Sequence, residues 1–419
     1  MNAKKSGLKV SPLAPTRFPD MGSVPGVRVA SISCGLKKSG KSDLLFVELA
    51  DSTTVAGVFT QSLTASAPVQ WSRRALKGGV ARGLVANSGC ANVFTGKAGI
   101  QAVEQTVEAA ADLLSSRPSK IFVASTGVIG EPIAVDKITS TLPKLKAVMS
   151  EANWKNAARS IMTTDTFCKG ATRTAEISGV KVKINGIAKG SGMIHPDMAT
   201  MLAFIFTDAA LPSDVAQSLL SASVDRSFNS ITIDSDTSTS DTVLLFSTGA
   251  GNTHPKIKSA DEKILNDFKA SLDEVTADLA HQVVRDGEGA SKFITVSVTS
   301  ARSDAAAKRI AFSIATSPLV KTSIAGEDAN WGRVVMAVGK AGEEIDVNKL
   351  QISIGDKLVA LQGCAIPDLD ESPIAEHMKG SEITIDVDVG FSPEGNGSAK
   401  VWTCDLTHGY IDINADYRS

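Results

Sequence analysis

The sequence predicts a layered fold of the α/β or α+β class, and three observations support this prediction. Strand-like and helix-like segments alternate along the 419 residues. The two halves are alike in composition and no long Pro/Gly/Ser-rich linker separates them, so we expect one interwoven unit or two intimately packed lobes. No tandem repeat with a period of roughly 20 to 50 residues is present, which argues against a solenoid or a propeller.

In the first half, β-rich runs alternate with helical patterns. Residues 100–114 carry apolar side chains at helical spacing, and residues 133–149 and 152–162 predict two further helices. Residues 176–187 alternate between apolar and polar, which predicts a strand pair with turns near Ser178-Gly179 and Asn185-Gly186. Three more strands are expected, at residues 44–49, 55–60 and 121–125.

The second half repeats this style around one long helix. Residues 260–284 place an apolar side chain every three or four residues, which is typical of a helix that packs one face on a core. Shorter helices are expected at residues 305–315 and 331–338. Strands are expected at residues 293–298, 350–354, 383–389 and 400–406.

Composition and charge exclude several function classes. The chain has 43 Lys and Arg against 45 Asp and Glu residues, so it lacks the basic surplus of a nucleic-acid or anionic-membrane binder. The five cysteines and five histidines show no CxxC, HxH or HExxH spacing, so we predict neither a disulfide framework nor a metal site. Unpaired cysteines and the lack of a secretory apolar segment favour the cytoplasm. A short organellar presequence remains the alternative, because residues 1–17 are basic without any acid.

The segment from Lys189 to Ile205 is the most unusual part of the sequence. A Gly/Ser/Pro stretch leads directly into an apolar run, and Ala199 and Thr200 stand at the junction. On composition alone, this is a loop that enters a strand, with Thr200 as an ordinary strand residue. Lys189-Gly190-Ser191 also imitates a phosphate-binding loop in reverse, but it lacks the required spacing and the following helix.

A second interpretation is a chain cut between Ala199 and Thr200. The cut would give Thr200 a free α-amine, whose pKa near 8 lets it accept a proton at neutral pH. The neighbouring hydroxyl would then have its own base, as in nucleophiles built on an N-terminal threonine. The same hydroxyl could attack the Ala199 carbonyl to make the cut itself.

Several motifs decide between these interpretations, because together they resemble the ornithine acetyltransferase family of arginine biosynthesis. They occur in family order from about residue 18 to the terminus, and their joint specificity is high although each alone is weak. The motifs are NSGCAN at 87–92 with TG at 95–96, STGVIG at 125–130, MTTDT at 162–166, SFN at 227–229, DTST at 236–239, GEGASKF at 287–293, NWGR at 330–333 and NADYRS at 414–419.

The resemblance implies a role for each site residue. Thr200 would be the nucleophile that forms an acetyl-enzyme, and Thr126 and Gly127 would form the oxyanion hole. The implied substrate contacts are Lys189 for a carboxylate, Glu288 for the ornithine ammonium, a hydroxyl from Thr163 or Thr166 with Thr163 favoured, Thr200 itself, Asn414 and the terminal Ser419.

The resemblance also implies the reaction and the assembly. The acetyl group would pass from N2-acetyl-L-ornithine to L-glutamate in a ping-pong mechanism. Self-cleavage would give an α chain, residues 1–199 with residues 1–17 flexible, and a β chain, residues 200–419, which assemble as an (αβ)₂ heterotetramer. The fold would be the layered sandwich of DmpA-type self-processing aminopeptidases. No dissociable cofactor is required, and the sequence leaves open whether acetyl-CoA is a second donor.

Two other functions remain open at this stage, and the sequence departs from the common family pattern at a few positions. A self-processing amidohydrolase or aminopeptidase would let water resolve the acyl-enzyme, whereas a catalytically silent amino-acid sensor would keep an uncut chain. Asp197 stands where the family usually has Asn, three residues before Thr200, so its charge is expected to alter the rate of self-cleavage. No departure removes a proposed catalytic group.

Overall fold

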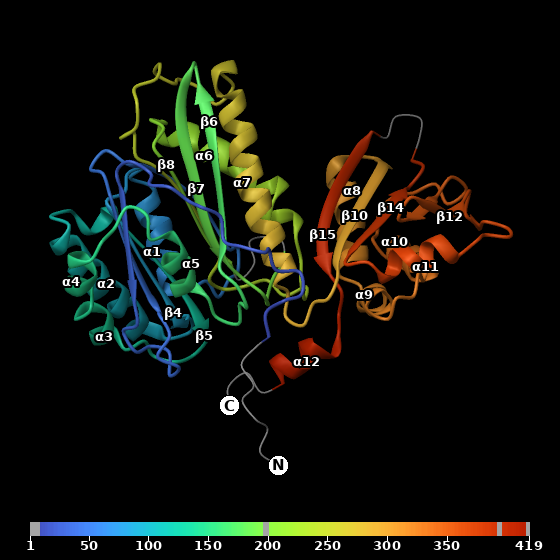
Figure 1. Cartoon of the computed structure of the whole chain (residues 1–419), viewed down its shortest axis with the longest axis horizontal. Helices are drawn as coiled ribbons and strands as arrows, with labels where there is room; N and C mark the ends of the chain where they lie inside the picture. The colour runs from blue at the N-terminus through green and yellow to red at the C-terminus, as the bar shows by residue number, and fades with distance from the viewer. Residues whose placement is uncertain (1–8, 196–200, 392–395, 416–419) are drawn as a thin grey trace, which may run out of the picture. The chain divides into compact units, whose positions relative to one another are not determined.

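The computed structural model describes residues 9–195, 201–391 and 396–415, and the chain divides into two compact units (Figure 1). Unit 1 comprises Met1–Ala14, Ser230–Ser235 and Val284–Ser419. Unit 2 comprises Pro15–Asn229 and Asp236–Val283. The units are interleaved in sequence, and unit 2 contains residues from both sides of position 200.

Unit 2 contains two β-sheets. The four-stranded sheet has the order β1-β2-β4-β5, with strands Val27–Ile32, Leu44–Leu49, Gly83–Cys90 and Ile121–Val128. The five-stranded sheet has the order β3-β9-β8-β7-β6, with strands Thr54–Phe59 (β3), Thr242–Ser247 (β9), Leu202–Thr207 (β8), Val180–Lys189 (β7) and Lys169–Ile177 (β6). Strands β2 and β8 are buried along their whole length, as strands covered on both faces must be.

The two sheets of unit 2 share one apolar core. Side chains of β2 and β5 from one sheet and of β8 and β9 from the other belong to the same buried cluster. Phe122 of β5 and Phe246 of β9 meet edge to face, with ring centroids 6.1 Å apart. The sheets therefore pack face to face.

Helices cover the outer faces of these sheets. A second apolar cluster joins α2 (Gly96–Leu113), α3 (Val135–Thr139) and α4 (Leu142–Ala147) to the four-stranded sheet. On the five-stranded sheet, a Cβ added to Gly186 of β7 would lie 2.7 Å from Leu279 of α7 (Asn266–Arg285), so the helix backs directly onto the strand (Figure 1). The remaining helices of unit 2 are α1 (Ala67–Leu76) and α5 (Trp154–Ile161), which contribute side chains to the core shared by the two sheets, and α6 (Ser213–Arg226). This arrangement confirms the predicted layered α/β class.

Unit 1 contains a six-stranded sheet of order β13-β12-β11-β14-β10-β15. Its strands are β10 (Phe293–Ala301), β11 (Gln351–Ile354), β12 (Lys357–Leu361), β13 (Cys364–Ala365), β14 (Glu382–Asp388) and β15 (Gly397–Cys404). Its helices are α8 (Asp304–Ala315), α9 (Pro318–Ala325), α10 (Trp331–Gly339), α11 (Ser372–Lys379) and α12 (His408–Asn414). Strands β10 and β14 pair in parallel, and the other pairs are antiparallel.

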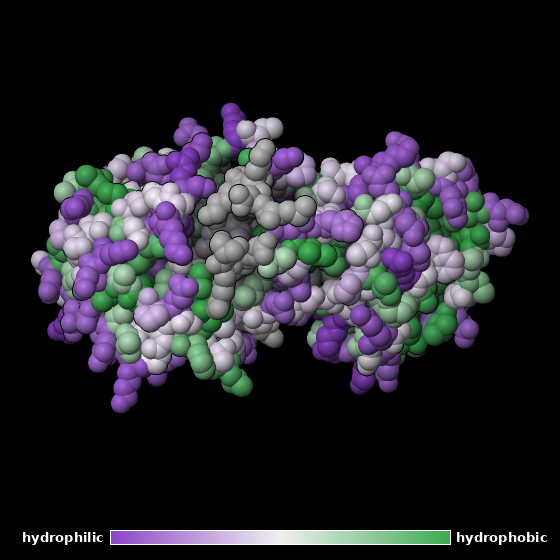
Figure 2. Space-filling view, turned by 90° about the horizontal axis from the view of Figure 1, so that it is seen from below, coloured by the Kyte–Doolittle hydropathy of each residue, from purple (hydrophilic) through white to green (hydrophobic). Residues whose placement is uncertain are grey.

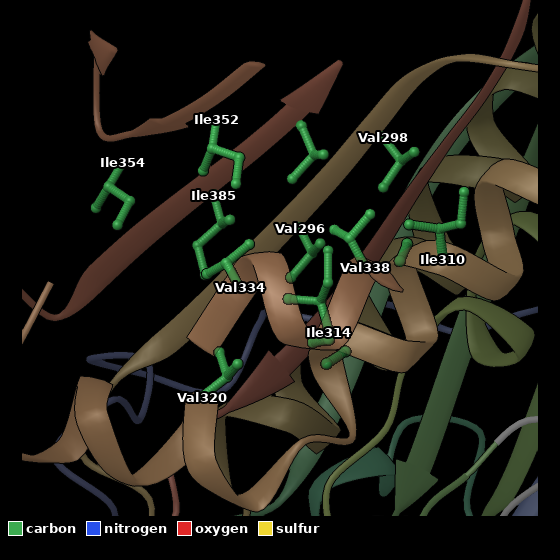
Figure 3. Packing of buried hydrophobic residues seen from close by; sticks show 14 of the residues in the cluster. Val296, Val298, Ile310, Ile314, Val320, Val334, Val338, Ile352, Ile354 and Ile385 are labelled. Atoms are coloured by element: carbon green, nitrogen blue, oxygen red, sulfur yellow. The ribbon is translucent and has the colours of Figure 1, made fainter. Parts of the chain in front are cut away.

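The core of unit 1 is aliphatic. Figure 3 shows Ile310 and Ile314 of α8 facing side chains such as Val296 and Val298 of β10, and all four are completely buried. Alternation along β10 places every second side chain toward the helices, so the strand buries one face there. We call this cluster the aliphatic core of unit 1.

Three details of the predicted secondary structure are wrong. The long helix expected at residues 260–284 begins only at Asn266, after a short 3₁₀ helix at Lys263–Leu265. Ser178-Gly179 is the predicted turn between β6 and β7, but Asn185-Gly186 lies inside β7, where it pairs with residues of both neighbouring strands. The helix expected at residues 133–149 is two short helices, because Pro143 cannot donate the N–H that a helix interior requires and instead sits in the first turn of α4.

The surface mixes polar and apolar residues. Hydrophilic side chains are interspersed with single apolar ones over the face shown in Figure 2. Within the described part of the chain, every helix is too short or too polar to span a lipid bilayer.

Candidate active site

Polar side chains gather in unit 2 where several strands begin or end. Thr126 lies near the end of β5, Lys169 opens β6, Lys189 closes β7, and Asp241 directly precedes β9. Asp165, from the loop before β6, completes the group. We call these five residues the strand-end cluster. All are at least nine-tenths buried, which is unusual for charged residues and requires each charge to have partners.

Gly127 follows Thr126 on β5, and its backbone explains why glycine is needed there. The residue has φ +132°, a conformation that side chains disfavour, and a Cβ at this position would lie 2.4 Å from the Gly89 carbonyl carbon. Gly89 is the register partner of Gly127 in the parallel β4–β5 pair. The absence of side chains lets the two backbones approach closely, beside the hydroxyl of Thr126.

Lys189 and Thr126 were predicted as parts of one site, and the structure brings them together. The Lys189 Nζ donates a hydrogen bond to Thr126 Oγ1 at 3.4 Å. Lys189 is 2% and Thr126 1% exposed, so this contact is shielded from bulk water. Since the ammonium occupies a lone pair of the hydroxyl, the Thr126 proton points elsewhere and can be donated to another acceptor.

Asp165 holds the loops around these residues. Its Oδ1 accepts hydrogen bonds from Lys169 Nζ and from the Gly190 N–H, each at 2.7 Å, and its Oδ2 accepts the Thr163 N–H at 2.8 Å. Burial alone would raise the pKa of Asp165, but the charges of Lys169 and Lys189 outweigh it and hold the pKa below its ordinary value. The Asp165 carboxylate therefore fixes both the Thr163 turn and the residue after Lys189.

The threonines near Asp165 remain open as substrate contacts. The Thr163 backbone binds Asp165, and the Thr164 hydroxyl bonds with the Ser191 hydroxyl at 2.7 Å. Thr163 and Thr166 are both partly exposed, so nothing in these contacts separates the favoured Thr163 from its alternative.

Lys37 is a neighbour of the cluster that the sequence did not predict. Its Nζ donates to the carbonyl oxygens of Met162 at 2.7 Å and Ser42 at 3.1 Å. Its stem packs over Gly89, where an added Cβ would lie 3.1 Å from the Lys37 Cγ. Burial lowers the pKa of Lys37 to about 8, although the negative charges of Asp43 and Asp165 oppose this. Lys37 thus ties the Met162 carbonyl to the end of β4.

Glu288 and Asn414, two of the predicted substrate contacts, belong to unit 1 and bind each other. The Asn414 Nδ2 donates to Glu288 Oε2 at 2.7 Å. Gly289 lets α12 lie close to Glu288, because a Cβ at position 289 would lie 2.5 Å from the Tyr410 nitrogen of that helix. The Thr407 hydroxyl also donates a hydrogen bond to the Gly289 carbonyl at 2.6 Å. The last described helix is therefore fastened beside Glu288.

Four predicted residues lie outside the described residues: Ala199 and Thr200 at the cleavage site, Asp197 and the terminal Ser419. The residues on either side of the first three are described. Lys189 of β7 pairs with Leu202 of β8, and six register pairs join these antiparallel strands.

Cysteine and metal chemistry find little support in the described residues. All five cysteines are free, and burial raises the pKa of four of them, most for Cys34, to about 12. Protonated thiols are poor nucleophiles. No group of three or more His, Cys, Asp or Glu residues within residues 9–195, 201–391 and 396–415 is arranged to hold a metal ion.

Comparison with known proteins identifies the family. The model of the ArgJ family matches residues 28–419. This chain belongs to the ArgJ family. The arginine biosynthesis bifunctional protein ArgJ of Gluconobacter oxydans is 52% identical over 412 residues, which cover 98% of this chain and 96% of that protein.

Two solved structures are also similar to parts of this chain. The ArgJ protein of Bacillus halodurans is 38% identical, covers 51% of this chain and 98% of its own, and superposes with a TM-score of 0.48. The ornithine acetyltransferase of Mycobacterium tuberculosis, solved with ornithine, is 33% identical, covers 42% of this chain and 95% of its own, with a TM-score of 0.38. The predicted family is thus confirmed by sequence over nearly the whole chain.

Proposed function

We propose that Thr200 is the nucleophile of this chain and becomes N-terminal by cleavage after Ala199. The chain is an enzyme, a bifunctional acyltransferase of arginine biosynthesis, as its membership of the ArgJ family shows. This result excludes the alternative of a catalytically silent amino-acid sensor. The observation that best supports the proposal is the buried contact between Lys189 and Thr126, which leaves the Thr126 proton available to a developing oxyanion.

In the first half-reaction, the Thr200 hydroxyl oxygen attacks the acetyl carbonyl carbon of N2-acetyl-L-ornithine. The Thr200 α-amine takes the hydroxyl proton and returns it to the departing ornithine nitrogen as the amide C–N bond breaks. Negative charge grows on the carbonyl oxygen, and the Thr126 hydroxyl and Gly127 N–H donate to it. An acetyl ester on Thr200 and free ornithine result.

In the second half-reaction, the amine of L-glutamate attacks this ester. Its proton passes through the α-amine to the Thr200 oxygen as the C–O bond breaks, which regenerates the enzyme and releases N-acetylglutamate. In the second activity of the bifunctional enzyme, acetyl-CoA would supply the acetyl group in place of acetylornithine. The covalent ester makes a dissociable cofactor unnecessary in either case.

Five further residues are proposed as substrate contacts. Lys189, whose loop Asp165 fixes, would bind the substrate carboxylate, and Thr163 would add a hydroxyl contact. Glu288 would bind the side-chain ammonium of ornithine, with Asn414 as its neighbour. Ser419 would provide the last contact. Small zwitterionic substrates need only a few such charges, which agrees with a nearly neutral chain.

The two chains made by cleavage would stay together. Strand β7 precedes the cut and β8 follows it, yet the two are hydrogen-bonded neighbours in the middle of the five-stranded sheet. We further propose an (αβ)₂ heterotetramer in the cytoplasm, where free cysteines are stable.

Acetylornithine turnover with and without glutamate tests this proposal. Ornithine release should require glutamate beyond the first turnover, because the acetyl-enzyme waits for the second substrate. Thr200→Ala should abolish release, and Thr200→Ser, which keeps a hydroxyl, should retain part of it. Glutamate-independent release at the full rate would instead indicate the rival hydrolase, in which water resolves the ester.

A further inference from the structure

Asp241 is a completely buried acid with an unusual set of contacts. Its Oδ1 accepts the Met201 N–H at 2.9 Å, and the next residue, Thr242, donates its own N–H to the Met201 carbonyl at 3.1 Å. Met201 is therefore held from both sides at the point where β8 begins to pair with β9. The N–H that Asp241 holds belongs to the peptide bond between Thr200 and Met201.

The segment that carries Asp241 is itself fixed. The Asp241 carbonyl accepts the Thr60 N–H at 3.1 Å, and the Ser238 carbonyl accepts the Thr60 hydroxyl at 2.5 Å. The Thr239 carbonyl accepts the Ser66 N–H at 2.9 Å. These contacts tie the segment to the end of β3 and the start of α1, so the carboxyl of Asp241 has a defined position.

The second oxygen of Asp241 has bonding capacity left. Oδ2 is buried and has no partner in good hydrogen-bond geometry among the described residues, although the Ser238 side chain lies close enough to the carboxyl to lower its pKa. Buried acceptors normally have a partner, so an exception points to a group that this oxygen serves. The α-amine that cleavage would create on Thr200 is only three bonds from the Met201 nitrogen, and covalent geometry keeps the two nitrogens within about 3.7 Å of each other. Asp241 thus bonds a nitrogen that is only three covalent bonds from this amine.

We propose that Asp241 is a positioning residue for Thr200: it fixes the peptide bond that follows the nucleophile through the Met201 N–H. This inference rests on the proposed role of Thr200. Asp241 bonds neither substrate nor acetyl group; it acts through Thr200, both in self-cleavage and in acetyl transfer.

The direction of the pKa shift of Asp241 agrees with this role. Burial raises its pKa well above the ordinary value, against the opposing effects of the Met201 N–H, the Lys189 charge and the Ser238 side chain. A charged carboxylate near the Thr200 α-amine would favour the ammonium form, which cannot act as a base, so a raised pKa of Asp241 lessens this effect. An Asn side chain has the same shape, carries no charge and keeps an oxygen that can accept the Met201 N–H.

Asp241→Ala and Asp241→Asn, made in the full chain, test the proposal. The Ala variant should slow self-cleavage at least tenfold and, once cleaved, lower kcat at least tenfold with KM within threefold of wild type. The Asn variant should cleave and turn over within threefold of wild type. Asp241→Ala with wild-type cleavage and kcat would overturn the proposal, and so would an Asn variant that loses tenfold or more. If the Ala variant does not fold, the Asn variant decides alone.

Asp208 provides the matched control. It is a buried acid directly after the other end of β8, where its Oδ1 accepts the Lys183 N–H at 2.7 Å. Asp208→Ala should lower the melting temperature without changing kcat, and an equal loss of kcat in both variants would reduce Asp241 to a structural residue. The Thr200→Ala variant distinguishes a failure of the role proposed for Thr200 from a failure of the role proposed for Asp241. If this variant is cleaved and active, Thr200 is not the nucleophile. If it is intact and inactive, the role of Thr200 stands, and the Asp241 variants alone test the role of Asp241.

Discussion

The strand-end cluster of unit 2 and the aliphatic core of unit 1 are equally buried but chemically opposite. The core consists of side chains such as Ile310 and Ile314, which gain free energy by leaving water. The cluster buries Asp165, Lys169 and Lys189, whose transfer from water is unfavourable unless each charge is paired. A fold that needed only stability would not require the second arrangement. We therefore assign the residues of the aliphatic core to packing and those of the strand-end cluster to chemistry.

Burial of a charge alone does not make this distinction, as Lys321 of unit 1 shows. Lys321 is also almost fully buried, and its Nζ donates to the Thr403 hydroxyl at 2.9 Å and to the Cys404 carbonyl. These acceptors close the end of β15, which is a structural task. In the strand-end cluster, by contrast, Lys169 contacts the Asp165 carboxylate and Lys189 contacts the Thr126 hydroxyl. Thr126 is followed by Gly127, which has no side chain.

Lys169→Met should have the largest effect, because it leaves Asp165 buried without its ion-pair partner. We expect a loss of about 3–5 kcal/mol in the free energy of unfolding, measured by urea titration. The double variant with Asp165→Asn should recover part of this loss, since no uncompensated charge remains. A loss below about 1 kcal/mol in the single variant would show that the pair is dispensable.

Thr126→Val should affect activity rather than stability. Removal of one oxyanion donor lowers kcat by about 10²–10³ in comparable sites. Steady-state turnover of acetylornithine with glutamate measures this, and Thr126→Ser, which keeps the hydroxyl, is the control. Wild-type kcat in the Val variant would mean that this hydroxyl does not face the reacting carbonyl.

Ile314→Val, in the aliphatic core, should affect stability rather than activity. Loss of one buried methylene group is expected to lower the free energy of unfolding by about 0.5–1.5 kcal/mol, with kcat unchanged. The same urea titration and turnover assay apply. A fall in kcat without a loss of stability would contradict the division of roles between the two regions.

Glu48 should give the smallest effect, a change in how stability depends on pH. Burial alone would raise its pKa, but hydrogen bonds from Lys146 and Arg28 outweigh this and lower the pKa to about 2. A depressed pKa stabilises the fold above the ordinary value of 4.5, and this contribution disappears as the pH falls from there toward about 2. Glu48→Gln should therefore flatten the loss of melting temperature over this range, and an unchanged acid profile would contradict the shift.

The sequence predicted most of the fold through periodicity. The β-rich runs of β2 and β5 and the C-terminal end of the long helix α7 were located closely because packing agrees there with local preference. Asn185-Gly186 was misassigned as a turn because the pair favours turns locally, whereas sheet pairing on both sides of β7 prevails. A local preference cannot reveal a neighbouring strand.

The candidate site was predicted only where a motif or the unusual segment contained it. Thr126 and Gly127 stand in the STGVIG motif and Lys189 opens the unusual segment that ends at Ile205, and the structure brings Thr126 and Lys189 into contact. Lys37, Lys169 and Asp241 escaped prediction because their significance comes from burial beside residues distant in sequence. For Asp241 a signal existed, since it directly follows the DTST motif and Ser240, but sequence alone does not show which peptide bond its carboxyl holds.

The central claim is that Thr200 becomes an N-terminal nucleophile, and intact-mass analysis of the denatured protein tests it most directly. After incubation with N2-acetyl-L-ornithine alone, we predict two chains, of 199 and 220 residues, with one acetyl group on the 220-residue chain. Thr200→Ala should give one uncut, unacetylated chain of 419 residues. A wild-type enzyme that is fully active as one uncut chain, or an acetyl group on the 199-residue chain, would contradict the claim.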